Sequence, residues 1–186
     1  MTFWFILLGA PLLAYGLFAL LKPEMAARFL LKFPRSKTAG GVLAVAAWFF
    51  TAYELDTIGI EVFDKFLKFF PGELWILATV LSVLTYLWME NLLPIRALSA
   101  LMMLFPAEMF PVIRLCETPW RLTLVIFAYA CIIIGMIGMF YPWRIRQFVS
   151  WRVVSLKSVR IDGVMFATLG LLFLLLGLLS AFSIIK

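Results

Sequence analysis

The chain has 186 residues, of which 65% are hydrophobic and 14% are charged, and its formal net charge is +6. Its mean hydropathy is +1.08, and soluble domains have about 25% charged residues, so the composition excludes a water-soluble globular protein. The absence of histidine removes the commonest general base, the commonest metal ligand and the usual axial ligand of haem. We therefore expect an integral membrane protein without a cofactor, and most redox and hydrolytic functions are excluded.

Six apolar runs predict an all-α membrane protein with about six transmembrane helices. The first run, residues 3–21, has neither the basic start nor the small-residue cleavage site of a signal peptide, so we expect a retained helix. The other runs cover residues 38–56, 74–93, 97–113, 122–141 and 163–185. The run 97–113 is short and contains Pro106, Glu108 and Pro111, so hydropathy alone equally allows a re-entrant or interfacial segment.

The placement of charges favours a crossing by residues 97–113. Two basic loops hold ten of the sixteen cations, and each has one acid at its edge. The positive-inside rule places both loops in the cytoplasm, which requires an even number of crossings between them. We thus predict an inner (plasma) membrane protein with both termini outside the cytoplasm. The ten cations are Lys22, Arg28, Lys32, Arg35, Lys37, Arg144, Arg146, Arg152, Lys157 and Arg160.

Two stretches have the spacing of amphipathic helices that lie on the membrane surface. Residues 61–70 are expected on the outer surface and residues 23–35 on the cytoplasmic surface, where their basic face would meet anionic headgroups. The residues predicted to contact anionic lipid or a partner are Arg28, Lys32, Arg35, Arg144, Arg146 and Arg152.

An internal repeat is visible within a single predicted membrane domain, residues 1–186. Gly16, Ala19, Pro23 and Phe29 match residues 119 positions later, and after the basic loop the match resumes at an offset of 123. We predict a parallel duplication of a helix hairpin, with copies at 3–57 and 122–185. Residues 58–121 would connect the copies and contribute two further helices.

Small residues line one face of the second predicted helix and one face of the last. Such faces let helix backbones approach closely in lipid. Packing within the bundle and docking of a partner subunit are both consistent with them. The residues of the two faces are Gly40, Ala44 and Ala47, and Gly163, Ala167, Gly170 and Gly177.

Ionisable groups at membrane depth are candidates for function. Glu54 lies on the small-residue face of the second helix, and Glu108 lies between the two prolines of residues 97–113. They would form a proton or cation site, or else lie at the outer interface in contact with water. Glu90 and Arg96 bracket a turn and would pair across it.

These features favour a non-catalytic integral membrane subunit, a structural or assembly component of a larger complex. Its expected partners are membrane lipids and other membrane subunits, and not nucleic acid, because the basic loops adjoin membrane helices. The alternative is a small transporter or channel that uses Glu54 and Glu108. A membrane enzyme ranks third, because the acids are dispersed between the two sides of the membrane.

Overall fold

The structure is a computed structural model that describes residues 2–58, 73–89, 92–115, 118 and 120–181. These residues form helices and short connections, and no strand occurs among them. The chain divides into two compact units. Unit 1 comprises Met1–Lys32, Glu108–Ala130 and Arg146–Lys186, and unit 2 comprises Phe33–Ala107 and Cys131–Ile145.

Five helices of the described residues are long and apolar enough to cross a membrane. The predicted all-α, membrane-embedded class is confirmed at this level, and the number six stays a prediction. The five helices are α1 (Thr2–Leu21), α3 (Lys37–Ile58), α6 (Leu93–Arg114), α7 (Arg121–Phe140) and α9 (Leu156–Ala181).

The third and fourth apolar runs differ from expectation in length. Helix α5 (Glu73–Trp88) has 16 residues, or about 24 Å at 1.5 Å per residue, which is shorter than a membrane core of about 30 Å. Helix α6 has 22 residues and continues through Pro106 and Pro111. The run that looked doubtful from its prolines therefore forms a helix of spanning length, and the run that looked secure forms the shorter one.

The boundary between α5 and α6 explains this difference. Residues 74–93 form one apolar run, but α5 ends at Trp88 and Leu93 already belongs to α6. Pro94 lies in the first turn of α6, where its missing N–H removes no helical hydrogen bond. Glu90, Asn91 and Pro94 mark this boundary in the sequence, where a turn is expected between Glu90 and Arg96.

Two short helices follow α1 and α7, respectively. Helix α2 (Pro23–Lys32) continues into the 3₁₀ turn η1 (Phe33–Arg35), and α8 covers Pro142–Val153. The amphipathic spacing of residues 23–35 predicts the first of these helices, whereas the second basic segment, expected to be a loop, is corrected to a helix over Pro142–Val153. The predicted surface helix at 61–70 lies outside the described residues.

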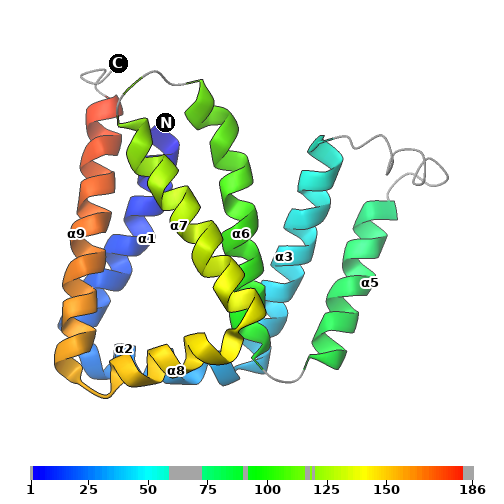
Figure 1. The fold of residues 1–186 in the computed structure, drawn as a ribbon, viewed down its shortest axis with the longest axis horizontal. Coiled ribbons are helices and arrows are strands. Elements are labelled where there is room, and N and C mark those ends of the chain that lie inside the picture. Colours follow the sequence, from blue (N-terminus) through cyan, green and yellow to red (C-terminus); the bar gives the residue numbers. More distant parts are fainter. Residues whose placement is uncertain (1, 59–72, 90–91, 116–117, 119, 182–186) are drawn as a thin grey trace. The chain divides into compact units, whose positions relative to one another are not determined.

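In unit 1, α1 and α9 pack side by side in antiparallel orientation (Figure 1). Thr2 Oγ1 at the start of α1 lies 3.0 Å from Ser180 Oγ near the end of α9. Farther along the pair, a Cβ added to Gly16 would overlap the Ala167 backbone, and one added to Gly170 would overlap the Leu13 backbone. The two backbones are therefore in direct contact along a line that we call the glycine seam, made by Gly9, Gly16, Gly163, Gly170 and Gly177.

In unit 2, α3 packs against α5 (Figure 1), and two further helices approach the pair. Helix α6 meets the beginning of α3, where a Cβ on Gly40 would lie 3.0 Å from Pro94 Cδ. Helix α7 meets α6 at Gly135 and Gly138, where an added Cβ would contact Met103 and Ser99, respectively. Glycine again marks the positions at which the helices come closest.

The two repeat copies contain the same order of elements. Each has a long helix, a short helix whose first residue is proline (Pro23 or Pro142), and a second long helix. The matched small residues pack on different neighbours, since Gly16 contacts α9 and Gly135 contacts α6. The duplication itself stays a prediction.

Candidate functional site

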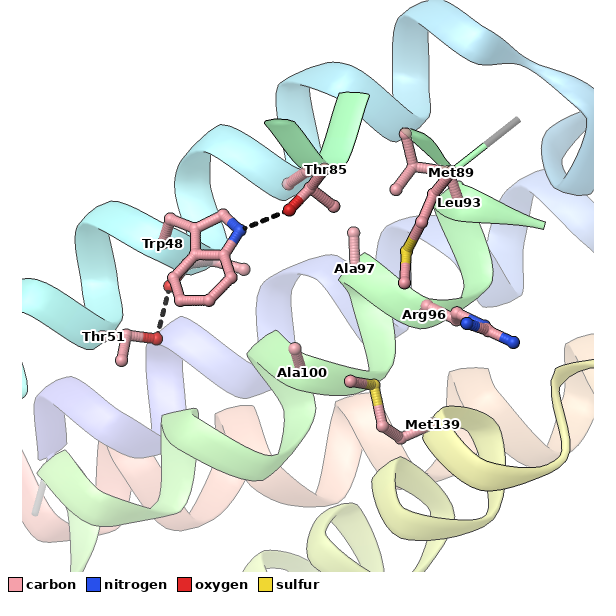
Figure 2. Close-up of a pocket in the computed structure, with 11 residues that line it drawn as sticks. Trp48, Thr51, Thr85, Met89, Leu93, Arg96, Ala97, Ala100 and Met139 are labelled. Carbon is pink, nitrogen blue, oxygen red and sulfur yellow. Dashed lines mark hydrogen bonds between the residues drawn. The ribbon is translucent and has the colours of Figure 1, made fainter. Parts of the chain in front are cut away.

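The candidate site is a cavity of about 190 Å³ in unit 2, which we call the Arg96 pocket (Figure 2). Its walls come from α3, from the end of α5, from the first two turns of α6 and from α7. The lining residues are Ala44, Ala47, Trp48, Thr51, Thr85, Met89, Leu93, Arg96, Ala97, Ala100 and Met139.

The cavity exists because small side chains face one another. Ala44 of α3 and Ala97 of α6 are buried together with Leu93, and Ala47 and Ala100 continue the same walls one turn deeper. Methyl groups on both sides fill less space than the helices leave between them. The result is an apolar cavity rather than a close-packed contact.

Polar groups of the pocket wall are already hydrogen-bonded within the chain. Trp48 Nε1 donates to Thr85 Oγ1 at 3.0 Å, which links α3 to α5. Thr85 Oγ1 in turn donates to the Leu81 carbonyl at 2.6 Å, and Thr51 Oγ1 donates to the Ala47 carbonyl at 2.8 Å. This part of the wall consequently offers a ligand mostly apolar surface.

Arg96 is the exception. It is the charged residue among those that line the pocket, and its Nε is shielded from solvent without a hydrogen-bond partner in the described part of the chain. Figure 2 shows Arg96 at one end of the pocket, with Trp48 and Thr51 at the other. The predicted partner Glu90 lies outside the described residues, so that pairing stays a prediction.

The backbone beside Arg96 is strained. Leu92 has a φ of 60°, a left-handed conformation that costs a non-glycine residue about 1–2 kcal/mol. Its carbonyl accepts hydrogen bonds from the N–H groups of Ile95 and Arg96, each at 3.2 Å. These bonds begin α6 and help to hold Arg96 at the pocket.

The two predicted intramembrane carboxylates belong to different units. Glu54 lies near the end of α3 in unit 2 and is 8% exposed. Glu108 lies in the part of α6 that belongs to unit 1 and is half-buried. Within the ranges that the structure describes, no three acidic or cysteine side chains gather in a way that could hold a metal ion. The ion site that would use both carboxylates stays a prediction.

The small residues predicted to form packing or partner faces lie against neighbouring helices. Gly163, Gly170 and Gly177 of α9 contact α1, and Ala167 faces Gly16 there. Gly40 contacts the start of α6, and Ala44 packs against Leu93 and Ala97. Ala47 is buried and lines the Arg96 pocket. Within each unit, the chain itself thus covers these faces, except where Ala44 and Ala47 border the Arg96 pocket.

The predicted basic contacts divide into exposed and paired residues. The exposed ones are Arg28, Lys32, Arg35, Arg144 and Arg146. Arg152 of α8 instead forms an ion pair with Asp162 of α9, and Arg152 Nε donates to Asp162 Oδ2 at 3.2 Å. The hydrogen bonds to Asp162 raise the pKa of Arg152 above its usual value. A second cavity, of about 400 Å³, adjoins this pair and is lined in part by Tyr15, Phe148 and Phe166.

Sequence reasoning missed two features of these sites. Arg96 was predicted to pair with Glu90 across a turn, and its place in the wall of a cavity inside unit 2 was not foreseen. The available signal was its spacing, because Arg96 precedes Ala97 and Ala100, two small residues on the same stretch of helix. Helix α8 was also missed, although its Pro142 matches Pro23 in the repeat.

No protein-family model, curated protein or solved structure matches the chain.

Proposed function

We propose that the protein is a non-catalytic integral membrane subunit, a structural or assembly component of a larger membrane complex. The observation that carries this proposal is the state of the hydroxyl groups within the apolar helices. Thr51, Thr79, Thr85 and Thr168 each donate to a carbonyl in their own helix, three or four residues earlier. Hydroxyls bonded in this way do not need water or an ion, so they suit packed helices better than a polar conduction path.

Polar contacts between helices support the same function. Trp48 bonds to Thr85 across α3 and α5, and Thr2 lies within hydrogen-bonding distance of Ser180 across α1 and α9. In lipid, such bonds hold helices together where no hydrophobic force drives their association. A rigid scaffold of this kind is suited to positioning other membrane subunits.

The exposed arginines and lysines support the proposed location and partners. Arg28 and Lys32 project from α2, and Arg144 and Arg146 from α8. We place these helices on the cytoplasmic side of an inner (plasma) membrane, where they would contact anionic headgroups or a partner subunit. Both termini would then lie outside the cytoplasm.

The decisive experiment is native mass spectrometry of the protein, extracted gently from its own membrane at its natural expression level. We expect a defined assembly with other, larger membrane subunits. A monomer or homo-oligomer under conditions that keep known complexes of the same membrane intact would contradict the proposal.

Proton or cation transport is the second candidate, and the burial of Glu54 favours it. A carboxylate that is 8% exposed in an apolar helix is costly, and such residues commonly mark ion pathways. Flux into proteoliposomes should then be lost in Glu54→Gln and kept in a control variant of the exposed Asp56, Asp56→Asn. Unchanged flux in Glu54→Gln would exclude this candidate.

A further inference from the structure

The Arg96 pocket combines one cation with apolar walls, and this combination indicates what it would bind. Its Arg96 Nε is shielded and lacks a hydrogen-bond partner among the described residues. Burying a polar group of this kind is unfavourable until an acceptor supplies the missing bond. An anionic oxygen is the strongest acceptor available to a guanidinium.

The rest of the pocket excludes a small hydrated anion as the preferred ligand. Ala44, Ala47, Ala97 and Ala100 give the walls an apolar surface, and the hydroxyls of Thr51 and Thr85 already donate to backbone carbonyls. Water in such a cavity finds few partners. The cavity of about 190 Å³ is somewhat larger than the cavity of about 150 Å³ that holds a benzene ring in a well-studied engineered protein, so it has room for a short stretch of acyl chain.

The direction of the pocket also matches an amphiphile. Arg96 lies in the first turn of α6, and Ala100 lies one turn farther along, about 6 Å deeper. On α3, the lining extends from Ala44 to Thr51, about 10 Å along the same direction. A ligand with its charge at Arg96 would therefore lay its apolar part along Ala100 and Ala47, toward Thr51 (Figure 2).

Charges at the same end of unit 2 add to this complementarity. Helix α3 begins there, since Gly40 in its first turn contacts Pro94 of α6. Arg35 and Lys37 just before Gly40 are exposed. An anionic headgroup at Arg96 would thus lie at a basic end of the unit, and a zwitterionic headgroup would gain less from it.

We propose that the Arg96 pocket binds one anionic phospholipid from the membrane, with a headgroup oxygen hydrogen-bonded to Arg96 and part of one acyl chain in the cavity. This inference does not depend on the proposed subunit function, because it concerns a site within unit 2 alone. It differs from the predicted lipid contacts of α2 and α8, which involve exposed cations.

The test counts bound lipids by native mass spectrometry. The purified full chain is delipidated in a neutral detergent and titrated with phosphatidylglycerol or with phosphatidylcholine of identical acyl chains. We expect one phosphatidylglycerol per chain to be retained. Both lipids offer a phosphate oxygen to Arg96, but only phosphatidylglycerol has a net negative headgroup, so the basic end of the unit should favour it over phosphatidylcholine by about tenfold. Equal retention of the two lipids would overturn the proposal.

Three variants separate the pocket from the surface. Arg96→Gln removes the donor to the phosphate and should lower the retention of phosphatidylglycerol about tenfold, and Arg96→Lys should keep most of the retention because the charge remains. Arg144→Gln is the matched control, since it removes an exposed cation of the same unit, and it should change retention less than twofold. An equal loss in Arg144→Gln and Arg96→Gln would show a surface charge effect and overturn the site.

Two further arms test the apolar part of the ligand and the integrity of the fold. Ala100→Phe fills the cavity from its wall and should reduce the retention of both lipids while Arg96 stays in place. Inorganic phosphate at millimolar concentration should not displace the lipid, and efficient displacement would assign the site to free anions instead. Helical content and melting temperature, measured without lipid, identify any variant that has failed to fold. The lipid retention of the variants that do fold then tests the proposal.

Discussion

The glycine seam of unit 1 and the Arg96 pocket of unit 2 are two interfaces made of small residues, with opposite results. In the seam, glycines of α1 and α9 bring the two backbones into direct contact. In the pocket, alanines of α3 and α6 leave about 190 Å³ unfilled beside Arg96. A small-residue face therefore does not by itself predict a tight contact. In the seam one partner of each contact is a glycine, so the neighbouring helix reaches its backbone, whereas alanine methyl groups stand on both sides of the pocket.

The largest expected effect is in the seam. Gly170→Leu would place a side chain where the Leu13 backbone lies, and overpacking without room to relax should reduce the free energy of unfolding by about 3 kcal/mol. Denaturant unfolding in micelles measures this. Val164→Leu on the exposed side of the same helix is the control, with a change within about 0.5 kcal/mol. Similar values for the two variants would contradict the close approach of α1 and α9.

A direct comparison of the two interfaces uses the same substitution in each. Ala19 is fully buried beside the glycine seam. A Cβ added to Gly163 would lie 3.1 Å from the Cβ of Ala19, so there is no room for a larger side chain at position 19. Ala19→Leu should therefore destabilise the protein by about 1–3 kcal/mol.

The matching substitution in the pocket should not reduce the free energy of unfolding. Ala100→Leu partly fills the cavity, so the free energy of unfolding without lipid should stay unchanged or rise by about 0.5 kcal/mol. A loss as large as that of Ala19→Leu would show that the pocket is closed in the folded protein.

The hydrogen bond between α3 and α5 should have an intermediate effect. A double-mutant cycle with Trp48→Phe and Thr85→Val isolates the bond from Trp48 Nε1 to Thr85 Oγ1. The expected coupling energy is about 0.6 kcal/mol, the average for such bonds between membrane helices. Additive effects of the two substitutions would indicate that the bond does not contribute to stability.

The smallest effect is expected for the ion pair between α8 and α9. Arg152→Gln should lower the melting temperature slightly, because Arg152 is partly exposed and water screens the pair. The pKa of Arg152 is raised, so its contribution is present below the unfolded-state value and is lost only as pH rises through the folded-state value. Both lie far above neutral, and the difference between wild type and variant should therefore be the same at about pH 6 and about pH 9. A clear change over this interval would assign the effect to another group.

Hydropathy and charge determined much of this protein in advance. Long apolar runs predicted α1, α7 and α9, because twenty apolar residues have few alternatives to a helix in lipid. The predicted limits of α1 and α7 differ from the observed ones by no more than one residue. The small-residue spacing on α9 also predicted a close-contact face, since glycines seven residues apart lie on one side of a helix.

Other features were decided by tertiary structure alone. The turn between α5 and α6 is indicated in the sequence by Glu90 and Pro94, but its limits and the left-handed backbone of Leu92 are seen only in the folded chain. The sequence likewise shows Ala44, Ala97 and Arg96 as separate residues, and only the packing of α3 against α6 brings them to one cavity. Side-chain spacing along one helix specifies which residues share a face. The volume between two faces depends on which helices meet and at what separation, and that is a property of the folded chain.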